Sequence, residues 1–234
     1  MFKFDKLAFG DLGWGDELLF ATLMTITVSI LSMGLGLCLA IITVWAKLMT
    51  NRITRFIANF YTTVVRGVPE LLVIYLIFFG GNSVVMGVAK IFGYNGYIEL
   101  NALTIGTIAI AFISATYSSE VIRAAYLAVN KGQIEAAKAI GLSKIQIFLR
   151  VMGPQIIRHA LPGIGNVWQI TLKDTSLISV TGLVEIMRQT RIASNVEHSP
   201  LTFLVTAAFL YLFLTTFSGK LFKVLETNYS KGYN

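Results

Sequence analysis

Four charged side chains lie inside stretches that are otherwise apolar, and they are the residues best placed to bind charged groups. Arg66 and Glu70 interrupt one stretch, and Lys173 and Asp174 interrupt another. A charge within a membrane span costs about 2.5–3.5 kcal/mol on insertion scales, so it is usually functional or paired. Two interpretations stand at this point. The four groups serve a binding function, or they form internal Arg66/Glu70 and Lys173/Asp174 salt bridges that hold the fold.

The first of these stretches also contains a predicted break in the helix. Pro69 removes a backbone donor and disfavours helical structure at Val68. Backbone groups freed within a membrane must face protein or water rather than lipid. The segment from Arg66 to Glu70 is therefore a candidate functional site, and a simple kink is the alternative.

Other reactive side chains are too sparse for a chemical centre. The single cysteine, Cys38, lies in an apolar run, and the two histidines, His159 and His198, are too far apart to indicate a metal site. No clustered acid, base and nucleophile suggests a membrane-embedded enzyme.

Composition indicates an all-α membrane protein. The 234 residues are 13% charged with a mean hydropathy of +0.71, whereas soluble domains are about 25% charged. No segment shows the alternation of a membrane barrel, so all spans are expected to be helices. Residues 81–99 are expected to form an exposed loop or short surface helix, and 183–199 a polar loop. Five apolar segments are predicted to span the membrane: 18–46, 56–80, 100–119, 160–182 and 200–219.

The distribution of basic residues predicts the topology. Twelve lysines and arginines gather on the side that holds 131–159 and the tail, and five gather on the other. By the positive-inside rule the richer side is cytoplasmic, so the N-terminal segment 1–17 faces out and the tail 223–234 faces in. The N-terminal segment lacks the apolar core of a signal peptide. Topology explains the net charge of +7, and nucleic acid is not expected as a partner.

The longest polar interval, 131–162, contains residues that begin and end helices, which a plain loop would not need. A short helix is expected from Glu135 to Gly141, and a second from Ser143, with Gln146 positioned for a capping box. Pro154 follows the expected end of the second helix. Two amphipathic helices joined at a glycine suggest docking, and a basic helical loop lying on lipid headgroups is the alternative.

The spacing in this interval resembles the EAA loop of importer-type ABC transporter permeases. Glu135-Ala136-Ala137 is followed after three residues by Gly141, and nine residues later by Val151, one residue and Gly153-Pro154. The family has Ile and Leu where this chain has Val151 and Gly153. The stretches 66–69, 117–123, 161–166 and 172–177 look like the polar amino-acid uptake subfamily. GDLGWG at 10–15 and ALPGIGN at 160–166 look closest to permeases for histidine, other cationic amino acids and opines.

The resemblance implies a type I ABC importer (MetI-like) permease fold with five transmembrane helices, over residues 18–222. The N-terminus would be periplasmic, the C-terminus cytoplasmic, and the location the bacterial inner membrane. Implied partners are a second permease subunit (the same or a related chain), two ATP-binding subunits, a periplasmic solute-binding protein and an amino-acid substrate. The chain has no phosphate-loop motif, so no cofactor is expected on it, and ATP would be used by the partner.

The resemblance also assigns expected roles. The loop 131–159 would couple to the ATPase, through Glu135, Ala136, Ala137, Gly141, Ser143 and Phe148. Glu120 and Arg123 are expected to be structural. Arg66 and the helix end at the break would receive a substrate carboxylate, and Asp174 with Gln169 an ammonium or cationic side chain. The complete expected substrate set is Arg66, Gly67, Val68, Glu70, Gln169, Lys173 and Asp174.

The expected function is therefore import of a polar, cationic amino acid (arginine, histidine, lysine or ornithine) or an opine, driven by a partner ATPase. Two alternatives remain open from the sequence. One is a permease for neutral or acidic amino acids such as glutamine and glutamate, and the other is a carrier that works without ATP.

Overall fold

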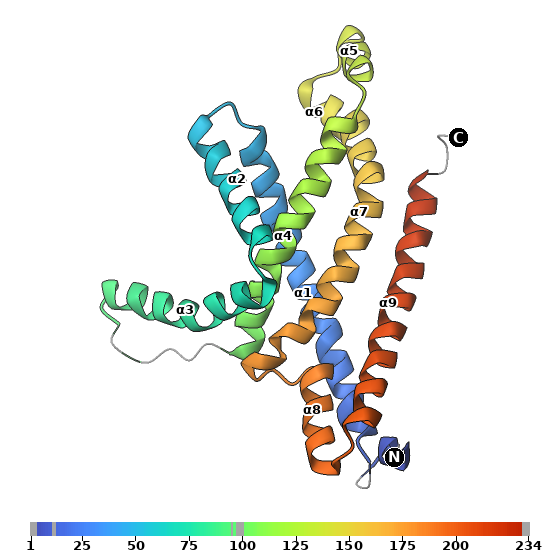
Figure 1. Ribbon diagram of the computed structural model, residues 1–234. Helices are drawn as coiled ribbons and strands as arrows, with labels where there is room; N and C mark the ends of the chain where they lie inside the picture. The colour runs from blue at the N-terminus through green and yellow to red at the C-terminus, as the bar shows by residue number, and fades with distance from the viewer. Residues whose placement is uncertain (1–3, 11–12, 95, 97–100, 231–234) are drawn as a thin grey trace.

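The computed structural model describes residues 4–10, 13–94, 96 and 101–230, and within them all regular structure is helical (Figure 1). The motif residues Asp11 and Leu12, and the basic residues Lys3 and Lys231, lie outside the described residues. The helices α1 (Gly15–Leu48), α4 (Ala102–Ala128), α7 (Gly153–Asp174) and α9 (Pro200–Ser230) run along roughly one direction. The start of α1 and the end of α9 lie at opposite ends of this bundle.

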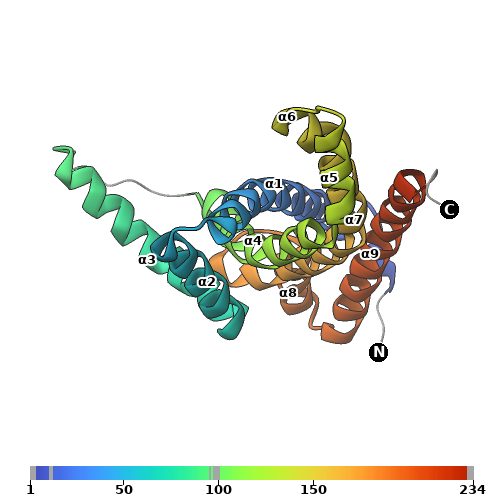
Figure 2. The ribbon, with the colours of Figure 1, turned by 90° about the horizontal axis from the view of Figure 1, so that it is seen from above.

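Helix α4 is the centre of the bundle. Seen along the bundle, it lies between α1 and α7, with α2 (Arg52–Gly67) beside it (Figure 2). In the most hydrophobic 18-residue stretch of α4, 61% is buried, against 11% in the corresponding stretch of α3 (Glu70–Ile91). One apolar cluster joins Ile110 and Ile113 of α4 to neighbours on α1, α2 and α3. Residues at the ends of α4 are therefore held by the rest of the fold.

A small residue allows α1 to approach α4 closely. A Cβ at Gly36 would lie 2.2 Å from Ser114 Oγ and 3.1 Å from the Ala111 carbonyl oxygen, whereas a Cβ at Gly34 would meet nothing within 4 Å. Gly36→Ala is expected to destabilise the protein by about 1–3 kcal/mol through overpacking. Gly34→Ala, two residues away, is expected to be neutral or stabilising, because alanine favours helix by about 1 kcal/mol over glycine. Thermal unfolding of the detergent-solubilised protein measures both, and equal melting temperatures for the two variants would contradict this account.

The predicted segment 56–80 is divided between two helices. Helix α2 ends at Gly67, Val68 and Pro69 are extended, and α3 begins at Glu70 and projects sideways from the bundle (Figure 1). The predicted break at Pro69 is confirmed. The expectation of a loop or short surface helix at 81–99 was wrong for its first part, because α3 continues to Ile91 as part of one 22-residue helix.

The predicted polar loop 183–199 was also wrong, because it contains α8 (Ile186–Glu197). Its first turn is capped by Glu185, whose Oε1 accepts from the Arg188 N–H at 2.7 Å and whose Oε2 accepts from the Met187 N–H at 2.9 Å. Tyr211 Oη of α9 also donates to Glu185 Oε2, at 2.8 Å. A single buried carboxylate thus fixes α8 against α9.

The polar interval forms α5 (Lys131–Ala139) and α6 (Lys144–Ile147), at the same end of the bundle as the end of α9 (Figure 1). Helix α6 does not stop before Pro154 as expected. It passes through a π-helical turn, η2 (Phe148–Met152), directly into α7. Pro154 is tolerated because it occupies the first turn of α7, where a missing N–H costs little. After Asp174 the chain continues as a 3₁₀ helix, η3 (Thr175–Thr181).

Four helices in the described residues are long and apolar enough to cross a membrane: α1, α3, α4 and α9. The predicted segment 160–182 is not among them, because it is divided between α7 and η3 and α7 carries several charges. The count of five spans and the sidedness of the two termini stay predictions.

Candidate functional site

The break between α2 and α3 separates Arg66 from Glu70. Arg66 lies in the last turn of α2, and Glu70 is the first residue of α3. The four-residue spacing that would pair them on one continuous helix therefore does not apply. Among the described residues no salt bridge joins Arg66 to Glu70, or Lys173 to Asp174. The two internal ion pairs considered from the sequence are not formed.

Tyr117 of α4 contacts both sides of the break. The Arg66 guanidinium lies over its ring, 5.4 Å from the centroid, and Tyr117 Oη donates to Glu70 Oε1 at 3.1 Å. Sequence reasoning gave Tyr117 no role, although it begins the 117–123 stretch that carries the family resemblance. Nothing local in the sequence reveals this role, because Arg66 and Glu70 reach Tyr117 only through the packing of α2 and α3 on α4.

The carboxyl groups of Glu70 and Asp174 are close enough to interact. Asp174 is the last residue of α7, and the helical backbone continues beyond it as η3. Lys173 is exposed beside it. Two acidic groups thus meet where α3 begins and α7 ends, and the structure brings together these two members of the expected substrate set.

Gln169 is not part of this group. Its Nε2 donates to the Thr215 carbonyl at 3.0 Å and to Ser218 Oγ at 3.4 Å, so it ties α7 to α9. The expectation that Gln169 works beside Asp174 finds no support, because five residues along a helix turn the side chain to a different face. Val68 is half-buried in the break, and Gly67 lines the pocket described next.

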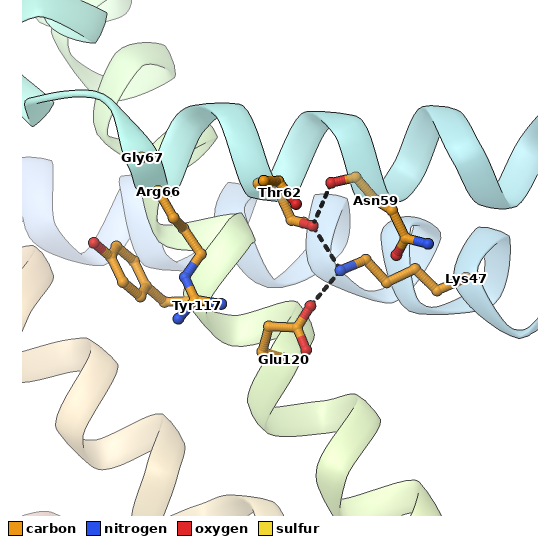
Figure 3. A pocket seen from close by; sticks show the side chains of 8 residues that line it. Lys47, Asn59, Thr62, Arg66, Gly67, Tyr117 and Glu120 are labelled. Atoms are coloured by element: carbon orange, nitrogen blue, oxygen red, sulfur yellow. Dashed lines mark hydrogen bonds and ion pairs between the residues drawn. The ribbon is translucent and has the colours of Figure 1, made fainter.

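A polar pocket of about 460 Å³ opens between α1, α2 and α4 (Figure 3). Lys47 of α1 reaches into it, and its side chain is only 4% exposed. Lys47 Nζ donates to Thr62 Oγ1 at 2.7 Å and also to Glu120 Oε1. Its lining includes Lys47, Asn59, Thr62, Arg66, Tyr117 and Glu120.

Glu120 and Arg123, predicted to be structural, take part in the ion-pair network at this pocket. Arg123 donates through Nε and a terminal nitrogen to Glu120 Oε2, at 3.0 and 2.9 Å. Glu120 therefore holds its own helix and, through Lys47, α1 and α2. Lys47 directly follows the predicted span 18–46, and nothing local in the sequence shows that its side chain turns inward.

The loop 131–159 has the turn that its spacing predicts. Helix α5 ends just before Gly141, whose φ of +81° is readily adopted by glycine, and the Leu142 N–H closes the end by bonding the Ala137 carbonyl at 3.1 Å. Ser143 and Gln146 form the predicted capping box. Helix α5 starts earlier than expected, at Lys131, because the Asn130 side chain caps it.

The surface of this loop is exposed and partly apolar. Ala137 is buried, whereas Glu135, Ala136, Gly141 and Ser143 are exposed. Four large apolar side chains are more than half exposed around the turn: Ile140, Ile145, Phe148 and Leu149. We call these four residues and the turn at Gly141 the knob. An apolar surface of this kind at the end of a helix pair is typical of a contact surface.

Comparisons with known proteins agree with these features. Residues 33–231 match the family described as "Binding-protein-dependent transport system inner membrane component". The chain is 48% identical to the nopaline transport system permease protein NocQ of Agrobacterium fabrum, over 97% of this chain and 96% of that protein. It is 44% identical to the octopine transport system permease protein OccQ of Rhizobium radiobacter (97% and 95%), and 38% identical to the histidine/lysine/arginine/ornithine permease protein HisQ of Escherichia coli (94% and 96%).

Solved structures show the same fold. An amino acid ABC transporter crystallised with histidines matches with a TM-score of 0.78 and 27% identity, over 92% of this chain and 95% of that one. The MetNI methionine ABC transporter in an inward-facing conformation matches with a TM-score of 0.67 and 15% identity, over 91% and 94%, which supports the fold alone. The all-helical MetI-like fold and the resemblance drawn from the EAA spacing are confirmed. The chain belongs to the family of binding-protein-dependent transport system inner membrane components, the membrane permease subunits of ABC importers.

Proposed function

We propose that this permease carries a cationic amino acid or an opine across the bacterial inner membrane. The observation that carries the proposal is the position of Glu70, at the start of α3 and bonded by Tyr117, close enough to Asp174 of α7 for the two carboxyl groups to interact. We call Glu70 and Asp174 the acidic pair. Two carboxylates in contact repel unless a proton or a cation lies between them. A guanidinium or ammonium group of the substrate would relieve that repulsion. Permeases similar to this chain are named for octopine, nopaline and histidine/lysine/arginine/ornithine transport.

The carboxylate end of the substrate would bind on the other side of Tyr117. The Arg66 guanidinium lies over the ring of Tyr117, whose hydroxyl bonds Glu70 of the acidic pair. In this arrangement Arg66 receives the α-carboxylate, and Glu70 with Asp174 receives the positive group. Gly67 and Val68 shape the break between them, and Lys173 limits the negative charge beside Asp174.

Five crossings of the membrane are part of the proposal. The four apolar helices supply four crossings, and α7 continued by η3 supplies the other. The N-terminal segment is then periplasmic and the tail cytoplasmic, in agreement with the twelve basic residues on the side of the knob.

The knob would dock on an ATP-binding subunit. Its exposed apolar side chains, with Glu135 and Ala136 beside them, would contact that partner, and the turn at Gly141 would set the angle between α5 and α6. The complete transporter would contain two ATP-binding subunits, a second permease subunit and a periplasmic solute-binding protein. Within it this chain would bind no cofactor, because the partner uses the ATP.

Reconstitution tests the function. The complex in liposomes, with its solute-binding protein outside, is expected to accumulate arginine or octopine only when ATP is enclosed with the ATPase subunits. Competition with arginine, histidine, octopine, glutamine and glutamate ranks the substrates. Uptake without ATP, or competition by glutamate stronger than by arginine and octopine, would refute the proposal.

A further inference from the structure

The pocket that contains Lys47 lies apart from the acidic pair. The Tyr117 hydroxyl, which bonds Glu70, points away from Lys47 and Glu120 (Figure 3). Arg66 lies over the Tyr117 ring and borders the pocket. Its volume of about 460 Å³ falls within the range of about 300–1,000 Å³ usual for small-molecule sites. The pocket is therefore a second space, separate from the acidic pair but close to the same tyrosine.

This pocket is rich in hydrogen-bond donors. Lys47 uses two of its three N–H groups, on Thr62 and Glu120. The Arg66 guanidinium lies over the Tyr117 ring, and among the described residues none of its five N–H groups is seen in a hydrogen bond. Asn59 adds an amide at the rim. An acceptor-only ligand matches this set.

The charge of the pocket also favours a ligand that only accepts hydrogen bonds. Two cations, Lys47 and Arg66, line it with one carboxylate, Glu120. Both oxygens of Glu120 already accept from cations, Oε1 from Lys47 and Oε2 from Arg123. A positive, polar pocket inside a membrane protein is not stable against lipid, so it faces water or protein. The ligand that fits is an anion.

The neighbouring acidic pair further restricts the kinds of anion that could bind in the pocket. A molecule that places a cation between Glu70 and Asp174 and reaches past Tyr117 would put its anionic end in the pocket. An arginine whose α-nitrogen carries a carboxyalkyl group, as in octopine and nopaline, has a guanidinium at one end and at least two carboxylates at the other. Arg66 can hold one carboxylate, and Lys47 with Asn59 can hold another.

We propose that the pocket is an anion subsite for a second substrate carboxylate, and that the substrate class is the opines. Lys47 and Arg66 are then specificity-determining residues, and the ordinary cationic amino acids are weaker ligands. The inference rests on the proposed function, because it assumes that the acidic pair binds the cationic end of the same molecule.

Equilibrium binding to the purified permease–ATPase complex tests this inference, without the solute-binding protein so that only the membrane site selects. The probes are octopine, arginine and agmatine, which is arginine without its carboxylate. An additional charged contact predicts that octopine binds about tenfold or more tighter than arginine. Octopine bound no tighter than arginine would overturn the proposal.

Two variants separate the two carboxylate positions. Lys47→Met combined with Glu120→Gln removes both partners of the ion pair, which disturbs the fold less than removal of one. This double variant is expected to bring the octopine and arginine affinities to within about twofold by weakening octopine alone, since it deletes one charged contact. Arg66→Gln is expected to weaken octopine and arginine by about tenfold or more and leave agmatine unchanged. Arg55→Gln, an exposed arginine on the same helix, is the matched control and should change nothing.

The same measurement identifies a competing anion. In nanodiscs of phosphatidylcholine, addition of phosphatidylglycerol should leave the octopine affinity unchanged, and a fall would show that a lipid phosphate occupies the pocket instead. An unchanged octopine-to-arginine ratio in the double variant would also overturn the subsite. Neither result affects the proposed function, which is refuted only by the uptake and competition results in liposomes.

Discussion

Asp174→Asn is expected to lower the affinity of the transporter for arginine by about 10- to 150-fold, because one charged contact is worth about 1.5–3 kcal/mol. Asparagine keeps the size of the side chain and removes its charge. Glutamine and other neutral amino acids, which place no second cation at the acidic pair, should lose least. Uptake into liposomes at several substrate concentrations gives the change in KM for each.

The stability of the same variant distinguishes a binding role from a structural one. The carboxyl group of Asp174 lies close enough to that of Glu70 to interact, and two like charges disfavour each other. Loss of its charge should therefore leave the melting temperature unchanged or raise it. Glu70→Gln removes the other charge of the acidic pair and should weaken arginine uptake in the same way. A fall in melting temperature together with unchanged uptake of arginine would show that Asp174 serves the fold.

Gly141→Val is expected to abolish most coupled uptake while the protein still inserts and assembles. The residue has a φ of +81°, which costs an L-residue about 1–2 kcal/mol and a β-branched residue more. A Cβ there would meet nothing within 4 Å, so the strain falls on the turn and not on packing. A changed angle between α5 and α6 would alter the contact of the knob with the ATPase.

The ratio of substrate imported to ATP hydrolysed is the measurement for this second variant, and we expect it to fall because the strained turn displaces the knob from its contact with the ATPase. Gly141→Asn is the matched control, because asparagine enters the left-handed region more easily than other side chains. Normal transport by the valine variant would exclude a coupling role for this turn.

Several features of the fold could be predicted because local chemistry determines them. The break at Pro69 follows from a missing backbone donor, and the end of α5 at Gly141 follows from the positive φ that the turn requires. The capping box at Ser143 depends on two residues three positions apart. In each case the signal lies within a few residues of the structure that it predicts.

Other features depend on contacts between distant segments. Gln169 bonds α9 rather than a ligand, and nothing near it in the sequence reveals that neighbour. In the sequence Tyr117 is part of an ordinary apolar span. In the fold, α2 and α3 bring Arg66 and Glu70 to its two sides. Lys47 reads as a basic residue at the end of a span, yet its side chain turns inward to Glu120. Charge and aromatic character identified candidates, and only tertiary packing decided their partners.

The π-helical turn η2 sets the direction in which Asp174 points. Helix α6, η2 and α7 form one rod from the knob to the acidic pair, and a π-helical turn is equivalent to one inserted residue. Deleting one residue from 148–152 would convert it to α-helix and rotate everything beyond it by about 100° about the rod axis. The direction of the Asp174 side chain is therefore determined by a turn more than twenty residues earlier in the chain, beside the knob. Tightening or widening that turn would rotate Asp174 relative to Glu70 without any substitution among the residues of the site.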